Sequence, residues 1–126
     1  MTIETFGLEH NFIVKCLKRF AEMLDIELPN MCVLVDETIK VNGACYQNAP
    51  DDYMIVLRVQ EEEGNMIQTL AHEMVHVKQF LKDDLASHFC FDIPYMERWW
   101  EIEAFEKEIV LMKDLIEKVI SGEITQ

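Results

Sequence analysis

The sequence predicts an α+β protein in which a first helix and a small three-stranded sheet precede two further helices. Two observations support this fold class. Apolar residues recur at helical spacing near both ends of the chain, and three short apolar runs bounded by turn residues lie between them. The chain has 126 residues, half of them hydrophobic, which is enough for one core. We therefore expect a single domain over residues 1–126.

The first expected helix runs from about Glu9 to Asp25, and Pro29 ends this region. One face of this helix is apolar and the other is charged, as is typical of an amphipathic helix that covers a core. The apolar positions are Phe12, Ile13, Cys16, Leu17, Phe20 and Leu24.

Three strands are expected next, over Met31–Val35, Ile39–Gln47 and Tyr53–Val59. Residues 48–52, with the sequence Asn-Ala-Pro-Asp-Asp, form a turn by composition. The short connections predict a small, partly antiparallel sheet. Gly43 lies inside the second strand, where a glycine often marks a bulge or the close approach of another backbone.

The third segment is a helix expected from about Asn65 to Leu81, with Asn65 as its N-cap. One apolar stripe of this helix should pack on the sheet, which leaves His72 and His76 free to face a cleft. The stripe consists of Ile67, Leu70, Met74, Val77 and Leu81.

The last segment is a long helix expected from Pro94 to near Gly122, after a connecting loop over Lys82–Phe91. Apolar residues recur along it at helical spacing, and we expect them to face the core. These residues are Trp99, Ile102, Phe105, Ile109, Met112, Ile116 and Val119.

The expected third segment contains the pattern H-E-x-x-H at His72, Glu73 and His76. Two histidines four positions apart lie on one helical face, so both rings can reach one metal ion. Glu73 points beside the metal, where it can hold and deprotonate a metal-bound water. Given the composition of the chain, this pattern arises by chance in about 1 to 2 percent of such sequences. The alternative is a surface helix whose two histidines happen to be stacked.

A catalytic zinc usually has three protein ligands and one position open for water. The last helix offers two candidates for the third ligand, Glu103 and Glu101. They point almost oppositely, about 200 degrees apart, so only one can bind the metal. We expect Glu103, because it stands beside the small Ala104 on a side flanked by aromatic residues, and Glu101 is the alternative. His88 does not fit the metzincin pattern, because positions 79 and 82 are Gln and Lys.

The formal net charge is −13, from 11 basic and 24 acidic residues. This excess argues against nucleic acid or an anionic membrane as the main partner, because both are bound through Lys and Arg patches. The four cysteines form no C-x-x-C pair and are expected to be free thiols. No secretory signal pattern and no apolar run of membrane-spanning length is visible, so we expect a cytoplasmic protein.

Two features resemble the gluzincin metallopeptidases. One is the string from Leu70 to His76, which follows a strand and an acidic turn, and the other is the glutamate-alanine pair on a later helix. The chain is most similar to minigluzincins and the related SprT-like and ImmA/IrrE-type phage and bacterial domains, over nearly its whole length. The resemblance implies a zincin-like fold and a zinc ion bound by His72, His76 and Glu103, with Glu73 as general base. It also implies a peptide substrate extended along the edge strand, which we expect around Gly43–Tyr46.

One position departs from the gluzincin pattern. Large gluzincins have an aspartate four residues after the glutamate ligand, which supports the first histidine, whereas position 107 here is Lys107. Glu106 is the candidate substitute. Tyr95 and His88 lie between the two metal-binding segments and are the candidates for stabilising the oxyanion, although packing or surface roles are the simpler explanation for both.

The predicted function is that of a zinc-dependent endopeptidase acting on peptide or protein. Two alternatives remain open. The chain could be a zincin-fold binding or regulatory protein that keeps the metal and cuts nothing, or a structural α+β domain without metal. The substrate, the cleavage preference and the oligomeric state are not determined by the sequence.

Overall fold

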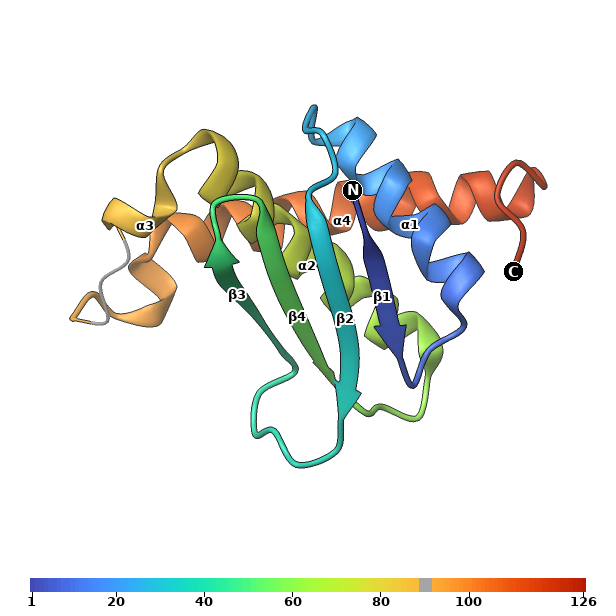
Figure 1. Cartoon of the computed structure of the whole chain (residues 1–126), viewed down its shortest axis with the longest axis horizontal. Coiled ribbons are helices and arrows are strands. Elements are labelled where there is room, and N and C mark those ends of the chain that lie inside the picture. The colour runs from blue at the N-terminus through green and yellow to red at the C-terminus, as the bar shows by residue number, and fades with distance from the viewer. Residues whose placement is uncertain (89–91) are drawn as a thin grey trace.

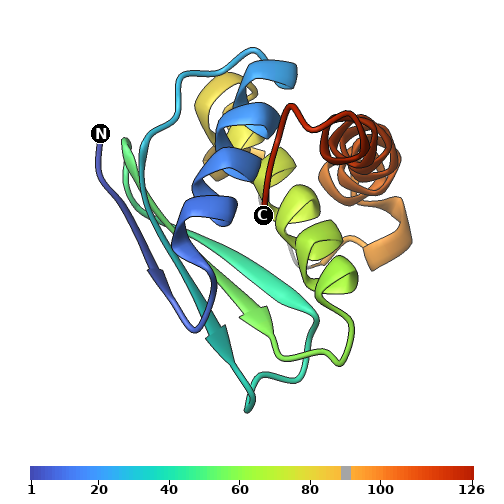
Figure 2. The same cartoon turned by 90° about the vertical axis from the view of Figure 1, so that its right-hand side faces the viewer.

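The computed structural model describes residues 1–88 and 92–126 and has an α+β architecture. A four-stranded sheet forms one layer, and the three long helices lie together on one of its faces (Figures 1 and 2). The strands are β1 (Ile3–Phe6), β2 (Asn30–Asp36), β3 (Gly43–Ala49) and β4 (Asp52–Arg58). The helices are α1 (His10–Met23), α2 (Glu63–Lys82), α3 (Leu85–His88) and α4 (Trp99–Ile120), and a 3₁₀ turn covers Tyr95–Glu97.

The sheet has the order β1-β2-β4-β3. The first three strands in this order are mutually parallel, whereas β3 pairs antiparallel with β4 and forms one edge. The partly antiparallel pairing and the three expected strands are therefore confirmed, with boundaries shifted by a few residues. The number of strands was wrong, because β1 was not expected. Its four residues, Ile-Glu-Thr-Phe, give too short a pattern to predict a strand.

The hydrophobic core lies between the sheet and helices α1 and α2, and it extends to Ala104, Leu111 and Leu115 of α4. The stripe predicted for α2 is confirmed at its first four positions, which are buried, whereas Leu81 is exposed. The predicted N-cap was wrong, since α2 begins at Glu63 and Asn65 lies inside its first turn. The capping interaction occurs on α1 instead, where the Glu9 carboxylate accepts hydrogen bonds from the backbone N–H groups of Asn11 and Phe12.

The prediction of which face of α4 is buried was wrong. The buried face consists of Trp100, Ala104, Glu108, Leu111 and Leu115, and most of the predicted positions are exposed, Ile109 at 66%. Both faces carry apolar residues at helical spacing, and the expected face is the more hydrophobic of the two. Helix α2 packs instead on the face that carries the small Ala104 and the polar residues Glu101 and Glu108, which contact the histidines of α2. The helix also begins at Trp99, after the 3₁₀ turn, and not at Pro94.

The expected loop over Lys82–Phe91 contains the short helix α3, while positions 89–91 lie outside the described residues. Cys16, Cys32 and Cys45 are free thiols, as expected, and Cys90 lies in the part that is not described. Among the described residues, no helix has both the length and the apolar character to cross a membrane.

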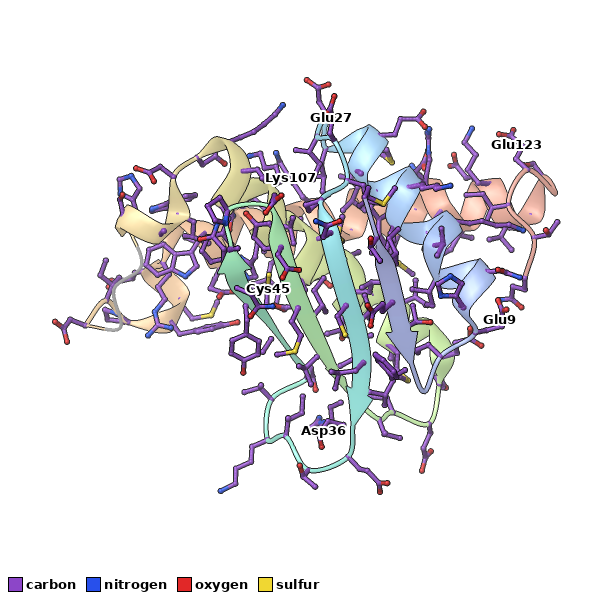
Figure 3. The ribbon with its side chains drawn as sticks, in the orientation of Figure 1. Glu9, Glu27, Asp36, Cys45, Lys107 and Glu123 are labelled. Atoms are coloured by element: carbon purple, nitrogen blue, oxygen red, sulfur yellow. The ribbon has the colours of Figure 1, made fainter. Side chains whose placement is uncertain are left out.

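Acidic side chains lie around the rim of the molecule, as Glu9, Glu27, Asp36 and Glu123 show in Figure 3.

Asp114 lies nearer the core and forms an ion pair with Arg19 that joins helices α1 and α4. The Arg19 guanidinium on α1 contacts Asp114 on α4 through two hydrogen bonds, Nε to Oδ2 at 2.7 Å and Nη2 to Oδ1 at 2.8 Å. Their side chains are only 23% and 18% exposed, so water screens this bidentate pair incompletely.

We expect Asp114→Asn to lower the free energy of unfolding by about 1 kcal/mol at neutral pH, measured by urea denaturation. Hydrogen bonding to Arg19 lowers the pKa of Asp114. The contribution is therefore present above the ordinary carboxyl pKa and disappears as the pH falls through the lowered value. Glu22→Gln is the control, because Glu22 also contacts Arg19 but its side chain is 71% exposed. Equal effects of the two substitutions would contradict the assignment.

Candidate metal centre

Helix α2 places His72 and His76 one turn apart on the side that faces α4. Both are buried, and their ring centroids are 5.0 Å apart. Their Nε2 atoms face one carboxylate oxygen, Oε1 of Glu101 on α4, at 3.0 Å and 3.2 Å. Three ligand-type atoms from two helices therefore converge on one point.

Glu73 completes a second grouping on α2. It is buried, and the ligand atoms of His72, Glu73 and His76 lie within 4.8 Å of one another. This group could hold a metal ion. The predicted motif residues are thus brought together as the helical spacing requires.

The structure brings Glu101 to the histidine pair, whereas Glu103 faces elsewhere. Both Glu103 carboxylate oxygens lie 3.2 Å from Lys78 Nζ, and Oε1 also accepts a 2.9 Å hydrogen bond from Gln79 Nε2. The expected position of Glu103 was therefore wrong. Ala104 does face α2, but adjacent helical residues point about 100 degrees apart, so Glu103 turns toward Lys78, whereas Glu101, three positions before Ala104, shares its face and points toward the histidines.

Each histidine is oriented through its other ring nitrogen. His72 Nδ1 lies 2.8 Å from Glu108 Oε1, and His76 Nδ1 lies 2.7 Å from Gln79 Oε1. The Gln79 amide nitrogen donates to the Trp100 carbonyl at 2.9 Å and to Glu103, so its oxygen is left to accept. Both Nδ1 atoms therefore carry the hydrogen. In the neutral rings, both Nε2 atoms then present lone pairs to Glu101.

Three acceptors that face one another require a proton or a cation between them. Burial lowers the pKa of His72, but hydrogen bonds to Glu101 and Glu108 outweigh it and raise the pKa to about 9. Burial raises the pKa of Glu101, yet bonds to both histidines outweigh it and hold the pKa far below its ordinary value. Without metal, protons therefore occupy the positions that a cation would take. A divalent cation bound there must displace them.

A cleft of about 760 Å³ lies beside these residues, and one of its walls is formed by residues 40–42 and by Gly43, the first residue of the edge strand β3. The expectation that the strand around Gly43 is an edge is confirmed. A Cβ atom at Gly43 would lie 2.5 Å from Thr69 Cγ2, 3.2 Å from the Val56 carbonyl oxygen and 3.4 Å from Glu73 Cγ. The glycine therefore lets β3 lie directly against α2 at Glu73. Cys45, labelled in Figure 3, follows on the same strand.

The opposite wall includes Tyr95, Phe105 and Ile109. The Phe105 ring packs edge-on against His72, with centroids 4.7 Å apart, and the Tyr95 hydroxyl lies 3.2 Å from Glu101 Oε1. Burial and the neighbouring Glu101 raise the pKa of Tyr95 to about 12. His88 packs instead on the Trp99 ring, at 5.8 Å, and does not line the cleft.

Two supporting residues were not anticipated. Glu108 supports His72, whereas the expected substitute, Glu106, is exposed. Gln79 supports His76. Glu108 lies seven positions after Glu101, two helical turns on the same face, so that spacing would have indicated it if Glu101 had been chosen as the ligand. Gln79 lies three positions after His76, within the same turn.

Comparisons with protein-family models, with curated proteins and with solved structures gave no match. The chemistry of this cluster therefore has to be inferred from the residues themselves.

We expect Gly43→Ala to lower the free energy of unfolding by about 1 to 3 kcal/mol, because the added methyl group has no space against Thr69. Thr69→Ser removes the clashing Cγ2 and keeps the hydroxyl that bonds the Asn65 carbonyl. In a double-mutant cycle measured by urea denaturation, Thr69→Ser should recover part of the loss. The nearby Val56 carbonyl prevents complete recovery. Additive effects of the two substitutions would contradict the close approach of β3 and α2.

Proposed function

We propose that this protein is a zinc-dependent endopeptidase in which His72, His76 and Glu101 bind the metal. The observation that carries the proposal is the convergence of two lone-pair-bearing Nε2 atoms and one carboxylate oxygen, with Glu73 beside them. Two imidazoles and one carboxylate are a donor set typical of catalytic zinc, and three protein ligands leave a position for water. The donors present thus fit the ion.

The resemblance to gluzincins supports the same proposal, with one change. A glutamate from a later helix completes the zinc ligands in both cases, but here Glu101 takes the place that the resemblance gave to Glu103. The hydrogen bonds that His72 and His76 donate to Glu108 and Gln79 also suit metal ligands, since such partners fix the ring orientation and the tautomer of ligating histidines.

Zinc at this site would lower the pKa of a coordinated water toward neutrality and polarise the scissile carbonyl. Glu73 is buried next to both histidines, which places its carboxylate to take a proton from that water and return it to the leaving amine. Tyr95 lines the same cleft, and its hydroxyl donates to Glu101 Oε1. With Glu101 bound to zinc, we assign this hydroxyl as the donor to the oxyanion.

The substrate is a peptide in extended conformation. Strand β3 forms one edge of the sheet, and its first residue, Gly43, lines the cleft, so an extended segment that pairs with the outer side of β3 would reach Glu73. Side chains of that segment would meet Phe105 and Ile109 on the opposite wall.

Glu73→Gln should reduce hydrolysis of an unfolded protein such as casein by about a hundredfold or more, because it removes the general base. Zinc content, measured on the purified protein, should stay near one ion per chain. Retained hydrolysis would exclude this role for Glu73. Stoichiometric zinc in a wild-type protein that cuts nothing would instead identify a metal-holding binding or regulatory protein, and wild-type protein without zinc would identify a structural domain.

Glu101→Gln and Glu103→Gln form a matched pair that tests the third ligand. Substituting a residue that only supports a ligand typically weakens metal binding by about 10- to 100-fold. Loss of a ligand itself should weaken zinc binding by more than that. We expect that result for Glu101→Gln, in competition titrations with a chelator. Glu103→Gln should change zinc affinity by at most about tenfold, since Glu103 acts only through Gln79. The reverse order would refute the assignment.

A further inference from the structure

Helix α4 carries a second apolar stripe, of which only Met112 and Val119 also pack against the core. The stripe consists of residues spaced alternately three and four positions apart: Ile102, Phe105, Ile109, Met112, Ile116 and Val119. Four of these residues are exposed, by 43% to 66%, and Met112 and Val119 are half-buried. An alternating spacing of three and four is the pattern of a coiled-coil seam.

The stripe is continuous over about 26 Å of helix, from the rise of 1.5 Å per residue. Single exposed apolar residues are ordinary on protein surfaces, whereas a contiguous exposed stripe marks an interaction site. Figure 2 looks along α4 and shows the helix at the periphery, with part of its circumference turned away from the sheet and from α1 and α2. A shallow groove of about 450 Å³, lined by Gln68 of α2 and by Ile109, Met112 and Ile116, runs beside the stripe.

The charges beside the stripe are self-complementary. Glu106 and Lys113 are both exposed and flank it on the same side, seven positions apart. An antiparallel pair of α4 helices, related by a twofold axis between positions 110 and 111, would place Ile109 of one copy opposite Met112 of the other. The same alignment brings Glu106 of each copy within reach of Lys113 of the other, which gives two symmetric ion pairs.

We propose that two copies of this chain associate through α4 in this antiparallel arrangement. With a net charge of −13, two copies repel each other in general. The stripe supplies apolar area for association, and beside it Glu106 of each copy faces Lys113 of the other. The proposal does not depend on metal binding or catalysis, although Phe105 and Ile109 also line the cleft, so that the second copy would narrow the cleft at the wall that we assign to substrate side chains.

Ile109→Glu and Val110→Glu test the stripe as a matched pair. Both positions are exposed on α4, at 66% and 57%, and both substitutions add the same charge, but Val110 lies off the stripe. In sedimentation-velocity experiments over a range of concentrations, Ile109→Glu should raise the dimer dissociation constant by at least about tenfold. Val110→Glu should change it by less than about threefold. Equal effects, or a wild-type protein that stays monomeric at all concentrations, would overturn the proposal.

A charge exchange tests the antiparallel register. Glu106→Lys and Lys113→Glu should each weaken the dimer, although they change the net charge in opposite directions, because each places like charges opposite one another. The double variant should restore the wild-type dissociation constant. Both residues are exposed, so folding should be unaffected, which far-ultraviolet circular dichroism checks. Failure of the double variant to restore association would overturn the register.

Discussion

Three acceptor atoms that meet between two helices are the constraint on which this structure depends. Two imidazole nitrogens on α2 and one carboxylate oxygen on α4 approach within 3.0 Å and 3.2 Å. Uncompensated, such a group would be unfavourable in a buried position. A proton or a cation at the centre turns mutual repulsion into attraction and holds α2 against α4. The positive charge at this point is therefore part of the packing of the two helices.

The surrounding residues fix the same geometry from outside. Gln79 joins His76 to the backbone of α4 at Trp100, and Glu108 joins His72 to the same helix. Ala104, between these two anchor points, is fully buried, which allows the helices to come close. Gly43 likewise allows a close approach, because its lack of a side chain lets the edge strand β3 lie against Glu73 of α2. The residues of the candidate metal centre are thus held by small residues at close contacts and by polar residues at the ring nitrogens.

The sequence predicted the features that depend on local periodicity. The motif helix and three of the strands followed from patterns within a few residues, whereas the edge position of Gly43 was expected from the resemblance to gluzincins. The rotation of α4 did not follow from such patterns, because that helix has two apolar faces and only tertiary packing decides which is buried. Choosing the more hydrophobic face left Glu108 unnoticed, and choosing Glu103 because it is next to Ala104 in sequence overlooked Glu101, which lies three positions before Ala104 on the same face. The exposed face, now unoccupied by the core, is the one to which we assign a second copy of the chain.

The edge position of β3 has a consequence for selectivity. A ligand that pairs with an outer strand offers its main-chain amides, which every peptide shares, so recognition there depends on conformation more than on the identity of side chains. Folded proteins keep their strands and helices internally paired and cannot present such a segment without local opening. Under the proposed function, the enzyme would therefore discriminate between proteins by how readily they unfold.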